Sequence, residues 1–272
     1  MDKESFYISM FNSKRIGDDG AVVDGWVYSS DAFCEDIHFK RSWMSLESIA
    51  QKAMLVNLSD AIAMNAKPRY ALITIAIPKG FTKEQLKALA SGFQKEAQRW
   101  GVEIVGGDTV ASSKLDISIT LISQAKRPIW RTPLKSGYLI GYTGELGRVK
   151  RDLQRLLRGG RVSKRSKFIT PTLRALFMER SARILQAAMD ISDGLFDDLA
   201  KLAKLNRKGF AFLKKIDKRV GCSGEEYELL FAVAPKDVEA LKRRAKMSRT
   251  RVTFIAKVVR GAFRNLCKPN HF

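Results

Sequence analysis

Strand-like and helix-like patterns alternate along the whole chain, and this alternation limits the folds open to it more than any other feature. Residues 115–121 place Leu or Ile at every second position between polar residues, which is typical of a half-buried strand. Thr82 and Gln85 form a capping-box pair, and apolar residues at helical spacing follow them up to Ala97. Repetition of both patterns predicts an α/β (α+β) protein.

The same patterns predict two domains. Pro128, Pro133 and Gly137 cluster between two periodic regions, so we expect domains at 1–133 and 134–272. Further helices are expected at 45–65, 172–187 and 236–246, and strands at 69–77, 102–105, 138–142, 209–212, 229–233 and 252–259. Residues 20–29 are expected to form a hairpin or two short strands around Asp24 and Gly25. A strand–turn–helix unit is expected to pass through 189–194.

Charge is distributed unevenly over the 272 residues, whose formal net charge is +21. Residues 18–60 carry eight acids and three bases, whereas 148–183 carry twelve bases and two acids and 236–268 carry eleven bases and two acids. The basic residues follow amphipathic helix patterns, without interleaved aromatics or zinc-finger spacing, so a solvated basic surface is favoured over a nucleic-acid-binding module. The acidic stretch inside so basic a chain indicates carboxylates gathered for a function.

The three cysteines, Cys34, Cys222 and Cys267, are widely scattered and include no CxxC pair. This usage predicts reduced thiols in the cytoplasm and argues against a disulfide scaffold or a cysteine-ligated zinc site. The longest apolar run, residues 71–77, is far shorter than the roughly 20 residues of a membrane-spanning helix. We therefore expect no membrane association.

Five short segments place an aspartate beside Gly, Ser or Thr next to a predicted strand or helix. They are GDDGAVV (17–23), SSDAFCEDIHF (29–39), NLSDAIAM (57–64), GGDT (106–109) and MDISDG (189–194). A single aspartate of this kind is usually a cap or turn residue. Five together favour a ligand site, because small neighbours allow the backbone to approach a ligand closely.

Carboxylates without histidine or cysteine partners are the ligand set that Mg²⁺ prefers, usually together with substrate phosphates. Only His38 and His271 are present, and no nucleophile elbow, Walker sequence or protein-kinase signature occurs. The residues therefore predict several Mg²⁺ ions that bind together with a polyphosphate. If the chain is a phosphoryl-transfer enzyme, its architecture differs from those of the common kinases and P-loop enzymes.

In their order along the chain, these segments and SGEEYELLFA (223–232) resemble thiamine-monophosphate kinase, of the aminoimidazole-ribonucleotide-synthetase superfamily. The resemblance implies a homodimer in which the N-terminal sheets join in a barrel, followed by a C-terminal α/β domain. It also implies direct in-line transfer from ATP to thiamine monophosphate, giving thiamine diphosphate, without a general base.

The resemblance assigns a role to each residue that matches the motifs of the family. ATP contacts are implied for Gly107, Asp108, Arg131 and Ser192, and substrate contacts for His38 and Glu225. Magnesium ligands are implied at Asp19, Ser29, Ser30, Asp31, Asp60, Asp108, Asp190 and Asp193.

Rival interpretations remain for the residues taken alone. His38 fits a structural histidine equally well, and Glu225, Glu226 and Glu228 fit a solvated acidic turn. For the chain as a whole, the alternatives are another ATP-dependent enzyme of the same superfamily and, less favoured, a basic nucleic-acid-binding protein. The chain departs from the family at GEE (224–226), where GED is usual, and in the short basic segment 148–166.

Overall fold

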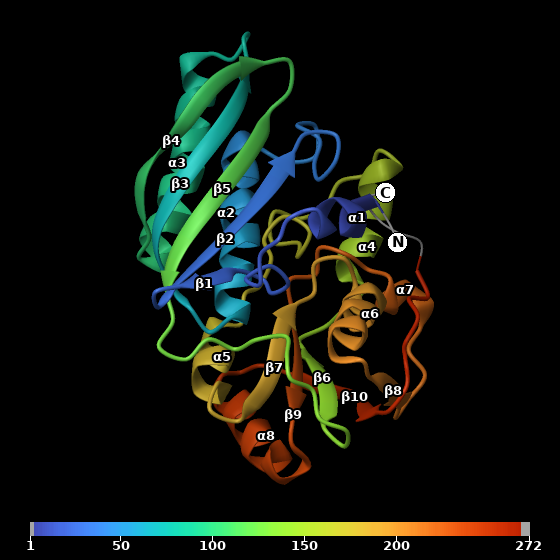
Figure 1. The fold of residues 1–272 in the computed structure, drawn as a ribbon. Helices are drawn as coiled ribbons and strands as arrows, with labels where there is room; N and C mark the ends of the chain where they lie inside the picture. Colours follow the sequence, from blue (N-terminus) through green and yellow to red (C-terminus); the bar gives the residue numbers. More distant parts are fainter. Residues whose placement is uncertain (1–2, 268–272) are drawn as a thin grey trace.

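The computed structural model describes residues 3–267, which form two five-stranded sheets (Figure 1). The N-terminal sheet has the order β1-β2-β5-β3-β4 and follows a short helix, α1 (Lys3–Ser9). Its strands are β1 (Ala21–Val23), β2 (Trp26–Cys34), β3 (Lys67–Pro78), β4 (Glu103–Ser112) and β5 (Asp116–Gln124). His271 lies outside the described residues.

Two long helices, α2 (Leu46–Ala63) and α3 (Lys83–Trp100), cover one face of this sheet. Each helix begins where its sequence predicts: Ser45 caps α2, and Thr82 with Gln85 forms a complete capping box at the start of α3. Helix α3 connects β3 to β4, which pair in parallel and therefore need a crossover. Figure 1 shows both helices behind the sheet.

The C-terminal sheet is antiparallel throughout, in the order β7-β9-β6-β10-β8. Its strands are β6 (Leu139–Thr143), β7 (Leu185–Asp190), β8 (Gly209–Phe212), β9 (Leu229–Val233) and β10 (Val252–Val259). The helices of this half are α4 (Arg148–Leu157), α5 (Ala175–Ser181), α6 (Leu195–Asn206), α7 (Lys218–Gly221) and α8 (Val238–Met247), with a 3-10 turn at Pro235–Asp237.

Strand β9 is buried on both faces, which explains why its sequence is a continuous apolar run. Leu229, Phe231 and Val233 point into a core that contains residues of α5 and α8, whereas Leu230 and Ala232 point into a second core under α6. The first core also contains most of the buried face of α2. Helix α2 therefore joins the two sheets into one packed body.

The α/β class and most expected elements are confirmed, with two differences. The helix expected at 172–187 ends at Ser181, and the chain then forms β7, because short apolar runs do not distinguish a buried helix from a buried strand. The strand expected at 102–105 continues through the GGDT segment to Ser112, since β4 pairs with β3 along that whole length.

The prediction of three reduced thiols is wrong for two of them. Cys222 and Cys267 form a disulfide across 45 positions of sequence, and Cys34 is free. Sequence spacing gave no sign of the pair, because the fold brings the C-terminal segment against the end of α7. Among residues 3–267, no helix is long and apolar enough to span a bilayer.

Gly107 permits a close approach of two strands that no other residue would allow. Its φ is +148°, and a Cβ built there would lie 1.8 Å from the carbonyl oxygen of Ile73 on β3. Gly107→Ala is therefore expected to lower the free energy of unfolding by about 2–4 kcal/mol. Chemical denaturation measures this change.

Gly80→Ala is the matched control, because its Cβ would meet nothing within 4 Å and no unusual φ is required. This variant should unfold within about 0.5 kcal/mol of the parent protein. Equal unfolding midpoints for the two variants would contradict the close approach of β3 and β4.

Candidate active site

One turn of α2 links the two sheets through polar side chains. The Ser59 hydroxyl donates a hydrogen bond to Asp190 Oδ2 at the end of β7 (2.7 Å). The Asn57 amide oxygen accepts one from the backbone N–H of Asp31 on β2 (2.9 Å). Asp60 follows on the same helix, so the NLSD segment brings residues of β2 and β7 to a common point.

At that point three carboxylates from distant segments meet. Oxygens of Asp19, Asp60 and Asp190 all lie within 4.8 Å of one another. Asp19 precedes β1 and is 9% exposed, and Asp190 ends β7 and is 2% exposed. This group, the central acidic cluster, brings together three of the aspartates that the sequence predicts to share a site.

The carboxyl groups of the cluster resist ionisation. Burial and then the charge of Asp19 raise the pKa of Asp190 to about 8. Burial followed by Asp31 and Asp190 raises the pKa of Asp60 well above its ordinary value, and burial also raises that of Asp19. The pKa of Asp31 rises to about 6 for the same reasons, since burial adds to the charges of Asp19 and Asp193.

Arg131 faces the cluster. The guanidinium of Arg131 is hydrogen-bonded and ion-paired with Asp19, and a second nitrogen donates to the carbonyl of Gly17 (3.3 Å). Its backbone N–H donates to Asp18 (2.6 Å). One guanidinium cannot neutralise three ionised carboxylates, so full ionisation of the cluster requires a bound cation.

The open oxygens of the site fit Mg²⁺. Asp19 Oδ2 and the Ser29 hydroxyl are buried without a hydrogen-bond partner among the described residues. All candidate donors are hard oxygens, and unmet carboxylate oxygens in a buried site are satisfied by cations. Asp19, Ser29, Asp31, Asp60 and Asp190 could hold magnesium together.

Side chains alternate along β2, and the predicted ligands on it therefore lie on opposite faces of the sheet. Ser29 and Asp31 face α2, whereas Ser30 lies on the opposite face, where its hydroxyl is 3.0 Å from that of Thr120. Asp108 on β4 shares the face of Ser30, because its register partner on β3 is Thr74 and the pairing continues to Ser118 of β5.

Gly107 and Asp108 are not brought to the central acidic cluster within this chain. Pairing in the sheet runs from Asp31 through Ile119 and Ile73 to Gly107, so three strand spacings separate the two ends, roughly 14 Å. Their assigned roles in ATP and metal binding stay predictions for the single chain.

Asp193 belongs to a second acidic group with Asp197 and Asp198, at the start of α6. The Lys201 ammonium pairs with Asp193 and lies 3.6 Å from an oxygen of each of the other two. Ser192 is tied to the opposite loop, because its carbonyl accepts a hydrogen bond from the N–H of Glu225 (2.6 Å).

Residues 226–228 of the acidic turn are buried and Glu225 is partly buried, so the interpretation of this segment as a solvated turn is wrong. Glu226 is 0% exposed and pairs with Lys167 (2.9 Å), and Glu228 pairs with Lys167 (3.0 Å) and Arg174 (2.7 Å). These two acids therefore hold the basic segment that precedes α5. Lys167 and Arg174 are therefore neutralised inside the fold.

Glu225 is bound differently from its neighbours. Its Oε2 is 2.9 Å from the ammonium of Lys52, a fully buried lysine of α2, and its Oε1 is buried without a hydrogen-bond partner. Lys52 also lies 4.1 Å from the ring centre of Phe168 and 5.4 Å from that of Phe33. Sequence reasoning missed Lys52, because its helix is apolar nearly all round and the lysine gives no local signal.

His38 is held by the turn that follows β2. Its Nδ1 accepts a hydrogen bond from the N–H of Cys34 (3.0 Å), and its ring stacks on Phe33 at 5.6 Å. These contacts are those of a structural histidine. Since Phe33 also faces Lys52, they place His38 on the Glu225 side of the site.

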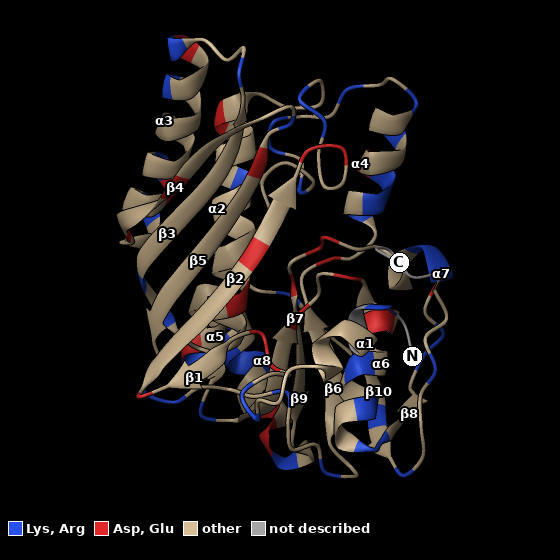
Figure 2. Ribbon diagram, turned by 45° about the horizontal axis from the view of Figure 1, so that its top comes forward, with Lys and Arg blue, Asp and Glu red and all other residues tan. Residues whose placement is uncertain are grey.

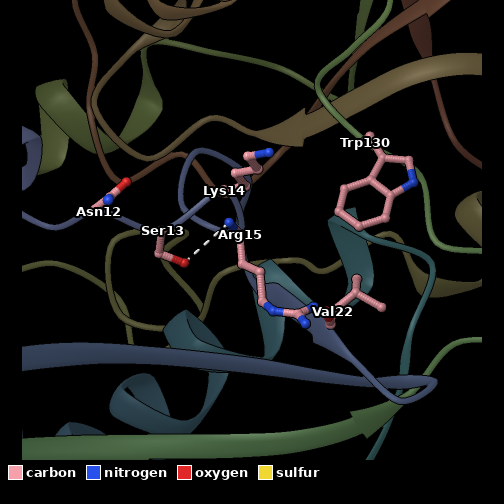
Figure 3. Close-up of a pocket in the computed structure, with 6 residues that line it drawn as sticks. All are labelled: Asn12, Ser13, Lys14, Arg15, Val22 and Trp130. Atoms are coloured by element: carbon pink, nitrogen blue, oxygen red, sulfur yellow. Dashed lines mark hydrogen bonds between the residues drawn. The ribbon is translucent and has the colours of Figure 1, made fainter.

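A separate cavity of about 540 Å³ lies between residues 12–15, Val22 and Trp130, and Figure 3 shows its lining. Lys14 and Arg15 border it from the segment before β1, and Trp130 borders it from the segment after β5. The Arg15 guanidinium donates to the carbonyl of Val22 (2.9 Å). None of the predicted site residues lines this cavity.

Known proteins match the chain over most of its length. The family described as AIR synthase related protein, N-terminal domain, matches residues 17–125. A thiamine-monophosphate kinase of Nitrosopumilus maritimus is 31% identical over 237 residues, covering 80% of this chain and 76% of the relative. One of Leptospira interrogans is 31% identical over 236 residues, covering 76% and 75%.

A solved structure described as AaThiL complexed with AMPPCP and TMP has the same fold, with a TM-score of 0.85. Its sequence is 26% identical, and the alignment covers 96% of this chain and 90% of that one.

The raised carboxyl pKa values predict how the stability of the metal-free protein depends on pH. Between about pH 4 and pH 8 the folded chain holds protons on Asp31 and Asp190 that the unfolded chain has released. The free energy of unfolding is therefore expected to fall as pH rises through this window. Urea unfolding in EDTA at pH 5.5, 7 and 8.5 measures it.

Added Mg²⁺ should reverse the loss at pH 8.5 and have little effect at pH 5.5, because protons compete with the metal. Asp60→Asn removes one of the interacting carboxylates and should flatten the dependence. Stability that is constant across this range in EDTA would contradict the close grouping of the acids.

Proposed function

The chain belongs to the thiamine-monophosphate kinase family, and from this membership we propose that it transfers the terminal phosphoryl group of ATP to thiamine monophosphate, giving thiamine diphosphate and ADP. The observation that carries the proposal is the convergence of Asp19, Asp60 and Asp190 within 4.8 Å. A site rich in carboxylates and poor in histidine suits a reaction in which both reactants bear phosphate.

The acceptor needs no general base. A phosphate oxygen is already anionic at neutral pH, so catalysis consists of positioning the two phosphates and neutralising their charge. Magnesium held by Asp19, Asp60 and Asp190, with Asp31 and Ser29 beside them, would supply that neutralisation. Arg131 orients Asp19, and Ser59 orients Asp190 through their hydrogen bonds.

The substrate side of the site centres on Glu225. Its free, buried Oε1 faces no protein donor and can accept from, or sit beside, a cationic ligand such as the thiazolium of thiamine monophosphate. Lys52 holds the other carboxylate oxygen, and Ser192 holds the backbone N–H. Lys52 is thus a positioning residue for Glu225.

A homodimer would complete the site. The open face of the N-terminal sheet exposes large apolar side chains, including Tyr70, Leu72 and Val110, and strand β4 forms one edge of the sheet. A second copy packed there would bury this face and could bring its Gly107 and Asp108 to the Ser30 face of β2. Within one chain, Asp108 lies roughly 14 Å along the sheet from Asp31, too far to share a site with it. A contribution from a second copy would remove this separation.

Two further assignments belong to the proposal. The boundary between residues 133 and 134 is supported by its position between β5 and β6, the last and first strands of the two sheets. A cytoplasmic location follows from the need for ATP, since the Cys222–Cys267 disulfide removes the argument from reduced cysteines.

Replacing Asp60 tests the reaction. Asp60→Asn is expected to lower the Mg²⁺-dependent formation of thiamine diphosphate at least about 100-fold, because it removes a charged oxygen from the centre of the cluster. Asp24→Asn makes the same change at an exposed turn with φ +48°, which asparagine also adopts, and should keep parental activity.

Chromatographic detection of the diphosphate product measures both variants, and circular dichroism confirms that they fold. Retained turnover in Asp60→Asn would remove this residue from the site. A folded parent protein that forms no diphosphate with Mg²⁺ or Mn²⁺ would overturn the proposed reaction.

Complementation tests whether Asp108 acts across the dimer. Asp60→Asn and Asp108→Asn should each be inactive alone. If the two residues serve one site from different copies, a heterodimer keeps one intact site, and an equimolar, re-equilibrated mixture should regain about a quarter of parental activity.

A mixture that stays inactive while mixed dimers form would place both residues in one chain. Size-exclusion chromatography with light scattering, applied to differently tagged copies, measures the exchange.

A further inference from the structure

Helices α5 and α8 lie side by side on one flank of the C-terminal sheet, away from the α6 side (Figure 1). Between them is a cavity of about 410 Å³ lined by Glu179, Arg180, Arg183, Arg244 and Met247. It contains no residue of the central acidic cluster. The basic stretch 236–268 contributes to it through α8.

Within the described part of the chain, the three arginines of this cavity form no ion pair, and the Glu179 carboxylate that also lines the cavity leaves it with a net positive charge. Among residues 3–267, none of the three arginines has an acid within ion-pairing distance, and Glu179 pairs with no base. Arg244 Nη1 is buried and has no hydrogen-bond partner among the residues that the structure describes. Arg180, in contrast, donates a hydrogen bond to the carbonyl oxygen of Met247 (2.6 Å).

Both the desolvated guanidinium nitrogen and the mutual repulsion of the three cations raise the free energy of the empty cavity. A bound anion would relieve both effects. Guanidinium groups bind phosphate in a bidentate manner, and three of them around one cavity suit an anion with more than one phosphate group. The volume is that of a small-molecule site.

We propose that the cavity between α5 and α8 binds a small anion carrying two or more linked phosphate groups. The site is independent of the proposed kinase reaction. Arg183 lies between α5 and β7, the strand that ends in the catalytic-site Asp190, so an occupied cavity would contact the segment leading to that strand.

The test uses the whole 272-residue protein and inorganic tripolyphosphate in EDTA, which keeps metal ions from the central acidic cluster. Isothermal titration is expected to show saturable binding at least about tenfold tighter than that of inorganic phosphate, because more than one phosphate group meets an arginine. Arg183→Gln and Arg244→Gln should each weaken tripolyphosphate binding about tenfold. Their kinase turnover without the anion should equal that of the parent.

Arg243→Gln is the matched control, because Arg243 adjoins Arg244 on α8, carries the same charge, and does not line the cavity. It should bind like the parent. Since Arg244 is partly buried, unfolding curves are compared first, and the exposed Arg183 keeps the test valid if Arg244→Gln does not fold.

Three results would overturn the proposal: no saturable tripolyphosphate binding, equal weakening by all three variants, or tighter binding of a 20-nucleotide single strand with a steep salt dependence. The second would indicate only general attraction to a basic surface. The third would indicate a nucleic-acid surface.

Discussion

Hydrogen bonds from one turn of α2 hold together carboxylates that would otherwise repel one another. Ser59 binds Asp190, Asn57 binds the backbone of Asp31, and Asp60 lies on the same turn. Two charges separated by 4.8 Å in a partly buried site repel by roughly 3 kcal/mol. Because α2 also packs in the core shared by both sheets, the fold can impose this cost, and the raised pKa values of the acids record it.

Charged side chains whose partners all lie within the protein have a structural role, whereas those with an unpaired buried atom can bind a ligand. Glu226 is ion-paired with Lys167, and Glu228 with Lys167 and Arg174, so these two acids fix the segment before α5. Glu225 keeps one buried oxygen free beside the same turn, and Arg244 keeps one buried nitrogen free on the far flank. The same physical criterion thus identifies a site for a cation and a site for an anion.

Local chemistry made much of this fold predictable from the sequence. Capping residues located α2 and α3, and alternation located β5, while the spacing of acids and small residues predicted the central acidic cluster. Features that depend on distant contacts were missed: Lys52 gains its role only from Glu225, 173 positions away, and Cys222 pairs with a cysteine whose position only the fold determines. The positions of Ser30 and Asp108 also could not be predicted from the motifs. Side chains alternate along a strand, and both residues lie on the face of the sheet that is open in a single chain.

Anomalous diffraction from crystals grown with Mn²⁺ and a nonhydrolysable ATP analogue tests the central claim most directly, because it locates cations without reference to activity. The account predicts manganese peaks among the oxygens of Asp19, Asp60 and Asp190, with the analogue's phosphates in contact with them. Phosphates bound elsewhere, with no anomalous peak between these three residues, would contradict it.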